Sequence, residues 1–354
     1  MPTIVITGGH HNSALVVAQA LQAKGWKVVW IGHRFSARGD LHDSAEYREV
    51  TASKITFFDL KAAKLVPSPL ELIRFPTGIV QAIRILRQVK PRGILSFGGY
   101  LGGTVAIAGK ILGLPIFLHE QTITAGRANI LIGRLADKIY LTWPDSRKHF
   151  VGRDTMVVGL PLRPSLLSST PKQLFTRRKP TLLVMGGKQG AHVLNQFIFN
   201  NLHDLLTDFN IVHQTGTTSL THDYDQALSL KASLASLADC YLPLGYIGEN
   251  EIGTYLRSAA IYFGRSGAHV CYELAVLGIK SILVPLMSTH DHEQHKNATF
   301  LTKSQLGLIL PQSQLTYPSF IQAYSKLSAL KPIRQPLPLS ATSTIVTTLL
   351  SELK

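Results

Sequence analysis

The stretch from Gly264 to Gly278 reads G-R-S-G-A-H-V-C-Y-E-L-A-V-L-G and follows the apolar run from Ala259 to Phe263. This pattern predicts a strand, a turn of small residues and a helix. The first amides of such a helix lack intrahelical partners and carry the positive end of the helix dipole, so they can bind phosphate. Glu273 follows His269 by one helical turn, where its carboxylate could accept hydrogen bonds from a ribose. The stretch predicts a nucleoside diphosphate site, although such a turn can also serve packing alone.

Three other stretches repeat this order of strand, glycine-rich turn and helix. The turns are Thr7-Gly8-Gly9-His10, Phe97-Gly98-Gly99-Tyr100 and Gly186-Gly187-Lys188-Gln189-Gly190, each after an apolar run. Strands that alternate with helices predict parallel sheets. The two strongest turns open the two halves of the chain. We therefore expect an α/β protein of two Rossmann-like domains that face each other across a cleft.

The segment from Val158 to Pro164 is the expected boundary, because its two prolines stop any regular element. We expect a first domain over residues 1–160 and a second over 161–338. A helix over about 339–354 has apolar residues at helical spacing and is expected to pack back on the first domain. The predicted strands are 3–6, 27–31, 93–97, 115–119, 138–142 and 155–158, then 180–185, 210–213, 240–243, 261–263 and 281–284.

The chain has 36 Lys and Arg residues against 21 Asp and Glu, a formal net charge of +15. This excess favours an anionic partner, either nucleic acid or anionic lipid head groups. No nucleic-acid-binding motif accompanies the charge, so we expect no nucleic acid partner. A helix from about Pro76 within the segment Leu70 to Lys90 would be basic on one flank and apolar on the other. It either binds an anionic membrane surface or packs its apolar stripe on the first domain's sheet.

The compartment is indicated by the cysteines and by the start of the chain. Cys240 and Cys271 are too few for a disulfide framework, which favours a reducing environment. Met1 leads directly into a predicted strand, and charges such as Lys110 interrupt the apolar runs. We therefore expect neither a signal peptide nor a membrane-spanning segment.

Five blocks of the chain, in their order, resemble the MurG family of GT-B glycosyltransferases. They are Thr7-Gly8-Gly9-His10, then Gly98-Gly99-Tyr100, then His119-Glu120-Gln121, then Gly186 to Ala191 with Asn195, and finally Arg265 to Glu273 followed by Asp291, Gln294 and Asn297. The resemblance implies transfer of N-acetylglucosamine from UDP-N-acetylglucosamine to a polyprenyl-diphosphate acceptor, with inversion and without metal or cofactor. In peptidoglycan synthesis this step converts lipid I to lipid II. A peripheral enzyme at the cytoplasmic face of the cell membrane is therefore expected.

The resemblance also implies the site residues, with the acceptor at the first domain and the donor at the second. The implied acceptor-binding residues are Thr7, Gly8, Gly9, Gly98, Gly99 and Tyr100. The implied donor-binding residues are Asn129, Arg163, Lys188, Gln189, Ile247, Ser266, Gly267, Ala268, His269, Val270, Glu273, Glu293 and Gln294. The chain departs from the family's pattern in its first loop, of which only T-G-G-H remains, and at Lys188, where the family has serine.

His10 is the leading candidate for the catalytic base. We expect it in the first turn of the first helix, where the helix dipole lowers the pKa of imidazole and keeps the ring neutral. It could instead cap that helix or only hydrogen-bond a substrate phosphate. Arg163 and Lys188 are expected to add positive charge for the departing UDP. Lys188 could equally be a solvated residue at the tip of a loop.

The run from His290 to His295 is compatible with a metal site, but alternate histidines do not share a helical face. A capping box of Asp291 and Gln294 is the preferred interpretation, and it would aim Glu293 and Gln294 at the donor sugar. Three other functions remain open for the chain. They are a UDP-N-acetylglucosamine 2-epimerase, a GT-B transferase with another lipid acceptor, and a non-catalytic nucleotide-sugar or nucleic-acid binding protein.

Overall fold

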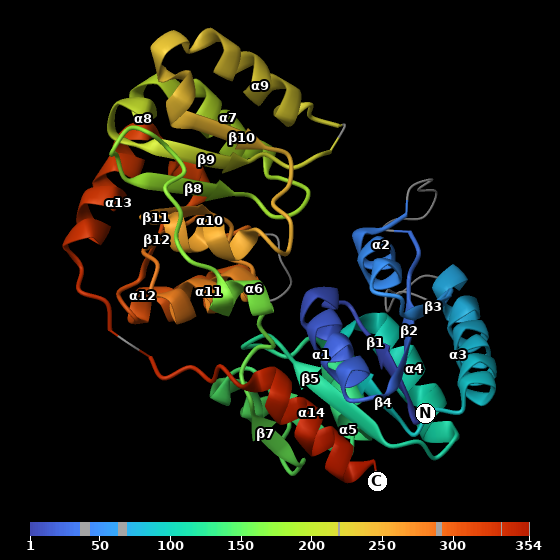
Figure 1. Cartoon of the computed structure of the whole chain (residues 1–354). Coiled ribbons are helices and arrows are strands. Elements are labelled where there is room, and N and C mark those ends of the chain that lie inside the picture. The colour runs from blue at the N-terminus through green and yellow to red at the C-terminus, as the bar shows by residue number, and fades with distance from the viewer. Residues whose placement is uncertain (36–42, 63–68, 219, 288–291, 334, 354) are drawn as a thin grey trace. The chain divides into compact units, whose positions relative to one another are not determined.

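The computed structural model describes residues 1–35, 43–62, 69–218, 220–287, 292–333 and 335–353, with side chains left out over 69–74. The chain forms two compact units (Figure 1). Unit 1 consists of Met1–Leu162 and Pro338–Lys354, and unit 2 consists of Arg163–Leu337. Each unit has its own sheet and its own apolar core, so the predicted pair of Rossmann-like α/β domains is confirmed.

Unit 1 has a seven-stranded parallel sheet in the order β3-β2-β1-β4-β5-β6-β7. The strands are β1 (Thr3–Thr7), β2 (Lys27–Gly32), β3 (Thr56–Asp59), β4 (Gly93–Ser96), β5 (Ile116–Glu120), β6 (Lys138–Leu141) and β7 (Thr155–Val157). The order reverses between β1 and β4, which pair with Thr7 opposite Ser96. The helices that follow these two strands, α1 and α4, lie on opposite faces of the sheet. Ligands bind at the carboxyl edge of open α/β sheets where the strand order reverses in this way.

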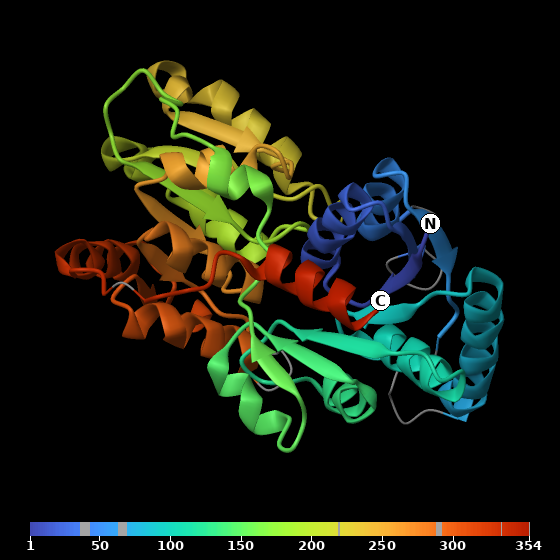
Figure 2. The ribbon, with the colours of Figure 1, turned by 60° about the horizontal axis from the view of Figure 1, so that its bottom comes forward.

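Helices cover both faces of this sheet. They are α1 (His11–Ala23), α2 (Ala45–Ala52), α3 (Pro69–Val89), α4 (Gly99–Ile111), α5 (Arg127–Leu135) and α14 (Ala341–Glu352), with a 3₁₀ segment at Pro144–His149. Successive residues of β1 point to opposite faces: Ile4 and Ile6 pack with α1 and α14, whereas Val5 packs with α3 and α4. Helix α14 lies beside α1 (Figure 2), so the end of the chain completes the core of unit 1.

Unit 2 has a six-stranded parallel sheet in the order β10-β9-β8-β11-β12-β13. The strands are β8 (Thr181–Met185), β9 (Asn210–Gln214), β10 (Tyr241–Leu244), β11 (Ile261–Gly264), β12 (Ser281–Leu283) and β13 (Gly307–Ile309). The helices are α6 (Pro164–Ser168), α7 (His192–Asn200), α8 (Leu202–Asp208), α9 (Asp223–Ser233), α10 (Ile252–Ser258), α11 (Ala268–Leu277), α12 (Glu293–Lys303) and α13 (Tyr317–Ala329). The strand order reverses between β8 and β11, and the turns after both strands are glycine turns predicted from the sequence.

The predicted strands are all present, with ends that differ by at most one residue. The sequence does not predict β3 and β13, each of which lies at the edge of its sheet. Strand β3 is only partly buried, and β13 is 3 residues long. Neither strand therefore shows the apolar run that marks a central parallel strand.

Helix α3 begins at Pro69, so the predicted start near Pro76 is wrong. Pro76 lies inside the helix, where its ring removes one main-chain donor. The later turns of α3 pack on the sheet through Ala82 and Leu86, which are buried. Arg84 and Arg87 are exposed on the other side. Residues 70–74 of the basic segment lie outside the side chains that the structure describes.

Candidate active site

The turns after β1 and β4 lie against each other at the carboxyl edge of the unit 1 sheet. Gly8 has a φ of +134°, and a Cβ at this position would lie 2.6 Å from the carbonyl carbon of Phe97. The amide of Gly9 donates to the carbonyl of Gly98 over 3.1 Å. Gly98 has a φ of +85°, which also favours glycine. The four glycines proposed for the acceptor, including Gly99, are therefore brought together.

His10 is the residue before α1, whereas the sequence predicts it in the first helical turn. Its side chain does not cap the helix. Instead, its Nδ1 lies 3.2 Å from the carbonyl oxygen of Phe97. Because a carbonyl oxygen only accepts hydrogen bonds, Nδ1 carries the hydrogen in this contact. The lone pair of the neutral ring is then on Nε2, which is the nitrogen able to accept a proton.

A buried polar layer supports the two turns. Glu120 accepts hydrogen bonds from the amide of Thr122 at 2.8 Å and from Nδ2 of Asn129 at 2.7 Å. Asn129 in turn accepts from the amide of Gly99 over 3.0 Å. Burial raises the pKa of Glu120 above its ordinary value, against these hydrogen bonds. Asn129, predicted to bind the donor, therefore lies in unit 1 and holds the turn after β4.

The other site residues predicted in unit 1 lie near the turns after β1 and β4. Thr7 is fully buried at the end of β1. Tyr100 is half-buried in the first turn of α4, with its ring centroid 5.7 Å from that of His33. His119 lies beneath the turns, and its Nε2 is 3.1 Å from the carbonyl of Gly159. Burial lowers the pKa of His119 to about 4, so this histidine is neutral near pH 7.

In unit 2, the turn between β11 and α11 carries the predicted phosphate site. Gly267 occupies the N-cap position of α11 and provides no side-chain cap, so the first amides of the helix have no side-chain acceptor at this cap. Ala268 begins the helix. The hydroxyl of Ser266 donates to the carbonyl of Gln294 over 2.8 Å, and Asn297 donates to the carbonyl of Ser266 over 3.2 Å. Ser266 therefore joins this turn to α12.

Two cations and two carboxylates form a charged cluster in unit 2. Nε of Arg163 lies 3.1 Å from Oε1 of Glu273, and its Nη1 lies 3.1 Å from Oε2 of Glu249. Nζ of Lys188 lies 3.8 Å from Oε1 of Glu249. Burial raises the pKa of Glu273; the neighbouring Arg163 opposes this shift and Glu249 adds to it. The cluster brings together three donor residues predicted from distant parts of the sequence.

Gln214 connects the turn after β8 to the loop after β10. Its Nε2 donates to the carbonyl of Gly187 over 2.9 Å, and its Oε1 accepts from the amide of Ile247 over 3.0 Å. Ile247, a predicted donor residue, is buried by this arrangement. Gly190 has a φ of +84° and leaves no room for a Cβ against the carbonyl of Thr215. The turn after β8 is therefore fixed by both its main chain and its neighbours.

The remaining predicted donor residues lie at the turn after β8 and near the turn between β11 and α11. His269 and Val270 lie in the first turn of α11 and are half-buried, whereas Gln189 is exposed. Gln294 accepts from the amide of Leu286 over 2.9 Å, and Glu293 is the first residue of α12.

The predicted capping box can be tested only in part. His292 occupies the N-cap position of α12 with a φ of +52° and makes no side-chain cap. Asp291 lies outside the described residues, so the box with Gln294 stays a prediction.

The sequence reasoning misses Glu249 and Gln214. Each follows or ends a predicted strand of unit 2, at the edge of the sheet where the glycine turns lie. A polar residue in that position is the signal that could have identified them.

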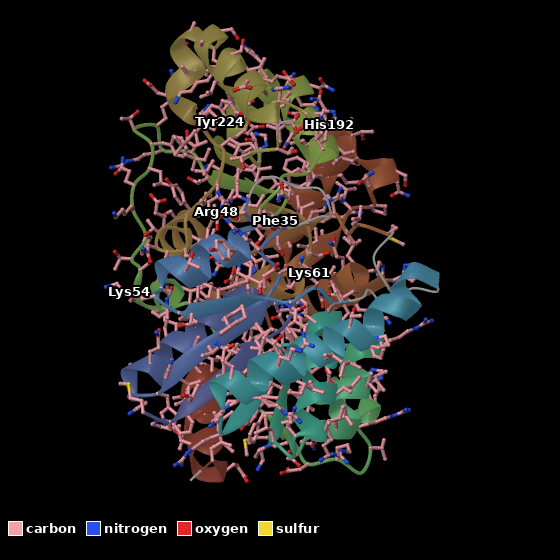
Figure 3. The ribbon with its side chains drawn as sticks, turned by 90° about the vertical axis from the view of Figure 1, so that its right-hand side faces the viewer. Phe35, Arg48, Lys54, Lys61, His192 and Tyr224 are labelled. Carbon is pink, nitrogen blue, oxygen red and sulfur yellow. The ribbon has the colours of Figure 1, made fainter. Side chains whose placement is uncertain are left out.

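A second polar network lies beside the turn after β8. Nδ1 of His192, labelled in Figure 3, is 2.8 Å from Oδ1 of Asp223. Asp223 accepts from Nδ2 of Asn195 over 2.7 Å, and Asn195 lies 3.0 Å from Nε2 of His213. Burial lowers the pKa of His213 to about 3. These hydrogen bonds hold α7 against β9 and α9. His192, at one end of the network, is half-exposed.

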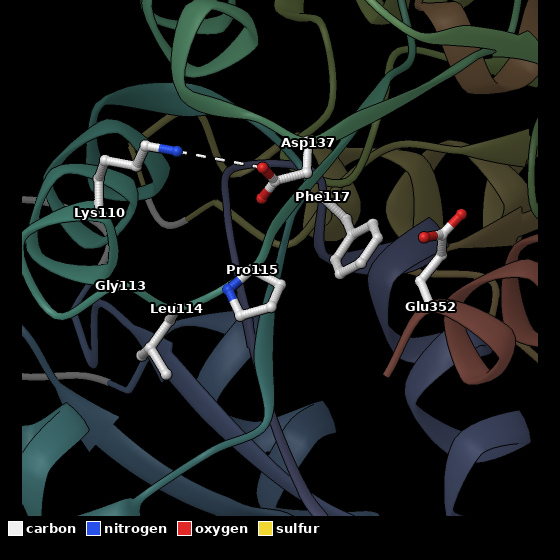
Figure 4. A pocket seen from close by; sticks show the side chains of 7 residues that line it. All are labelled: Lys110, Gly113, Leu114, Pro115, Phe117, Asp137 and Glu352. Carbon is white, nitrogen blue, oxygen red and sulfur yellow. Dashed lines mark ion pairs between the residues drawn. The ribbon is translucent and has the colours of Figure 1, made fainter. Parts of the chain in front are cut away.

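The pocket in Figure 4 lies at the opposite end of the unit 1 sheet. It encloses about 330 Å³ before the start of β5 and is lined by Lys110, Gly113, Leu114, Pro115, Phe117, Asp137 and Glu352.

Among the described residues, no group of three or more His, Cys, Asp or Glu side chains is placed to hold a metal ion. Within the same residues, no helix has the length and apolar character needed to cross a membrane.

Comparison with known proteins covers both units. Residues 4–141 match the glycosyltransferase family 28 N-terminal domain, and residues 181–340 match the C-terminal domain of the same family. The chain is 32% identical over 319 residues to a protein of Pseudomonas syringae pv. syringae (strain B728a), with 87% of this chain and 83% of the relative covered. It is 33% identical over 328 residues to a protein of Shewanella denitrificans, with 88% and 82% covered. Both relatives are named UDP-N-acetylglucosamine–N-acetylmuramyl-(pentapeptide) pyrophosphoryl-undecaprenol N-acetylglucosamine transferase.

Solved structures share the fold of the whole chain. The crystal structure of Acinetobacter baumannii MurG superposes with a TM-score of 0.76 at 24% identity, covering 99% of this chain and 100% of that one. A putative UDP-N-acetylglucosamine 2-epimerase from Listeria monocytogenes superposes with a TM-score of 0.66 at 11% identity, covering 99% and 96%.

Proposed function

Because the chain belongs to glycosyltransferase family 28, we propose that it catalyses the reaction for which its curated relatives are named. It transfers N-acetylglucosamine from UDP-N-acetylglucosamine to the N-acetylmuramyl-(pentapeptide) pyrophosphoryl-undecaprenol acceptor. The observation that carries the proposal is the charged cluster of Arg163, Lys188 and Glu273 beside the turn that opens α11. Unit 2 is assigned the donor and unit 1 the acceptor.

The donor is proposed to bind with its diphosphate at the first amides of α11 and its ribose at Glu273. The amides of Ala268 and the next residues supply the positive end of a helix dipole. Arg163 and Lys188 add two formal charges, which stabilise the negative charge that develops on UDP as the sugar leaves. These groups can perform the task that a divalent ion performs in metal-dependent transferases.

The acceptor hydroxyl is proposed to lose its proton to Nε2 of His10. The contact between Nδ1 and the Phe97 carbonyl favours the tautomer in which Nε2 is unprotonated. Gly8, Gly98 and Gly99 let the two turns and Asn129 pack closely, whereas a Cβ at Gly9 would meet nothing within 4 Å, so the acceptor diphosphate can approach the main chain at Gly9. With the base on the acceptor and UDP as the leaving group, direct displacement inverts the anomeric carbon.

Membrane association at the cytoplasmic face is proposed to be peripheral and to use α3. Its exposed Arg84 and Arg87 offer positive charge to anionic lipids, and Val80 is 46% exposed on the same helix. In such peripheral binding, the positive charge and a small apolar area act together.

The transferase is preferred over the 2-epimerase. The epimerase structure shares the fold at 11% identity, whereas relatives more than 30% identical over most of the chain are named as transferases. A shared fold at low identity does not carry a shared reaction.

The test is a transfer assay with the purified protein, UDP-N-acetylglucosamine labelled in the sugar, and a lipid extract that contains the acceptor. We expect label to move into the organic phase at a rate that EDTA does not change. Label that remains in the aqueous phase, or appears as the 2-epimer of the nucleotide sugar, would reject the transferase. Loss of activity with EDTA would reject the metal-independent donor site.

A further inference from the structure

Glu249 lies between the two cations that the proposed donor site offers to a diphosphate. It occupies the turn between β10 and α10, at the carboxyl edge of the unit 2 sheet. Its two carboxylate oxygens contact different partners: Oε2 lies 3.1 Å from Nη1 of Arg163, and Oε1 lies 3.8 Å from Nζ of Lys188. The hydroxyl of Ser165 donates to its carbonyl over 2.6 Å and anchors the turn. A bridging carboxylate in this position makes the contacts that phosphate oxygens would make.

The charges of the cluster are balanced. Arg163 and Lys188 carry two positive charges, and Glu249 and Glu273 carry two negative charges when ionised. A diphosphate that reaches Arg163 and Lys188 therefore meets a like charge on Glu249. At a partly exposed site, repulsion between charges a few ångströms apart is worth a measurable fraction of the binding free energy.

The cluster has three ion pairs, and they differ in exposure. Glu273 is 2% exposed and Arg163 is 13% exposed, so their contact is an inner pair. Glu249 and Lys188 are each 30% exposed, and their contact is the longest of the three. A partly exposed pair at this distance contributes little stability and opens readily. Glu249 can therefore leave both Lys188 and Arg163 while the inner pair with Glu273 continues to orient Arg163.

We propose that Glu249 is an internal stand-in for the donor's diphosphate. It pairs with Arg163 and Lys188 until the diphosphate takes its place, and it returns to both cations as UDP leaves. The inference rests on the proposed donor site and adds a specific role for Lys188. Lys188, in the glycine turn after β8, gives Glu249 its second cation.

The test compares UDP with uridine, which lacks the phosphates, by isothermal titration calorimetry on the full chain. Glu249→Gln keeps the size of the side chain and removes its charge. We expect this variant to bind UDP about tenfold more tightly, a typical size for coupling between neighbouring sites, and to bind uridine as the wild type does. The gain should decrease as salt is added, because the cluster is partly exposed. The inhibition constant of UDP as product should fall by the same factor.

Glu251→Gln is the matched control. Glu251 is an exposed carboxylate in the same segment, and it forms no ion pair among the contacts of the described residues. The control changes the net charge of the protein equally, so it should leave UDP affinity unchanged. A second comparison uses Lys188→Met, in which Glu249→Gln should give a smaller gain than in the wild type.

Each outcome decides the matter. Weaker or unchanged UDP binding by Glu249→Gln would overturn the inference, because Glu249 would then only position its partners. Equal tightening by Glu251→Gln, or an undiminished gain in the Lys188→Met background, would overturn it as well. Wild-type protein that binds neither UDP nor uridine would instead reject the proposed donor site. Circular dichroism of each variant separates these results from a loss of folding.

Discussion

The imidazole of His10 is oriented by a main-chain group, the carbonyl of Phe97 at 3.2 Å. The neighbouring His11 has a different partner, since its Nε2 lies 3.0 Å from Oε2 of Glu49 on α2. Two adjacent histidines therefore have different environments: one is beside the glycine turns, and the other joins two helices. This difference gives a matched pair of variants for the proposed base.

His10→Ala is expected to lower turnover by about 10² to 10⁴, the usual contribution of a positioned acid or base. The affinity for UDP-N-acetylglucosamine should remain unchanged, because the proposed donor site lies in unit 2. Initial rates at saturating acceptor, together with titration of UDP-N-acetylglucosamine in the absence of acceptor, measure the two effects separately. His11→Ala should retain most activity. A His10→Ala enzyme within a few-fold of wild type would remove His10 from the mechanism.

At the scale of elements, α2 is attached to β2 by the partly buried carboxyl group of Glu46. Nε1 of Trp30 donates to Oε1 of Glu46 over 2.7 Å. Burial raises the pKa of Glu46 to about 7, although the hydrogen bond from Trp30 opposes the shift. The folded protein therefore binds more protons at Glu46 than the unfolded chain does, between the ordinary pKa of 4.5 and about 7. The contribution of Glu46 to stability is present below that window and decreases as pH rises through it.

Glu46→Gln is expected to remove this dependence, since an amide keeps the acceptor for Trp30 and does not ionise. The variant should exceed the wild type in free energy of unfolding by about 1 to 3 kcal/mol at pH 8 and match it near pH 4.5. Denaturant titration followed by tryptophan fluorescence suits the test, because Trp26, Trp30 and Trp143 all lie in unit 1. An identical pH dependence in both proteins would contradict the assignment.

Helix α3 is the element assigned to the membrane. Replacing both Arg84 and Arg87 by Gln should weaken binding to anionic vesicles by roughly tenfold or more, because each basic residue near such a surface contributes about 1 kcal/mol. UDP affinity should not change. Co-sedimentation with vesicles measures the effect, and Lys326→Gln with Lys331→Gln removes the same charge from exposed sites of unit 2. If the control pair releases the protein equally, net charge rather than α3 is responsible.

At the scale of the whole molecule, the chain returns to unit 1 after completing unit 2. Ile345 and Leu349 of α14 are fully buried in the core that contains α1. Nη1 of Arg92 donates to the carbonyl of Leu353 over 3.1 Å, and Nζ of Lys138 lies 2.7 Å from Glu352. The last residues of the chain therefore stabilise the unit that contains the first.

Leu349→Ala should lower the free energy of unfolding of unit 1 by about 2 to 5 kcal/mol, the range for a large-to-small change in a core. Tryptophan fluorescence reports this transition, and UDP affinity should be retained because unit 2 is unaltered. Thr347→Ala, at an exposed position on the same helix, is the control and should change stability by less than about 0.5 kcal/mol. Normal stability of Leu349→Ala would show that α14 is dispensable for this core.

Much of the fold could be predicted because its signals are local. Apolar runs such as Leu182 to Met185 and the glycine turns after them indicate parallel strands that end at a ligand edge. The edge strands β3 and β13 could not be predicted, since β3 is only partly buried and β13 is 3 residues long, so neither has an extended apolar run. The predicted start of α3 at Pro76 was wrong. Proline is common at the start of a helix, but here the residues before Pro76 are helical as well.

The sequence by itself determined the α/β class, the glycine turns and the residue types of the proposed site, because these depend on neighbours along the chain. Only the tertiary structure decided which of them meet. Phe97 orients His10 from 87 residues away, and Asn129 accepts a hydrogen bond from the amide of Gly99, 30 residues before it. Glu249 is an ordinary turn carboxylate in sequence. Folding places it within ion-pair distance of Arg163 and Lys188, and electrostatic attraction depends on distance in space rather than on separation along the chain.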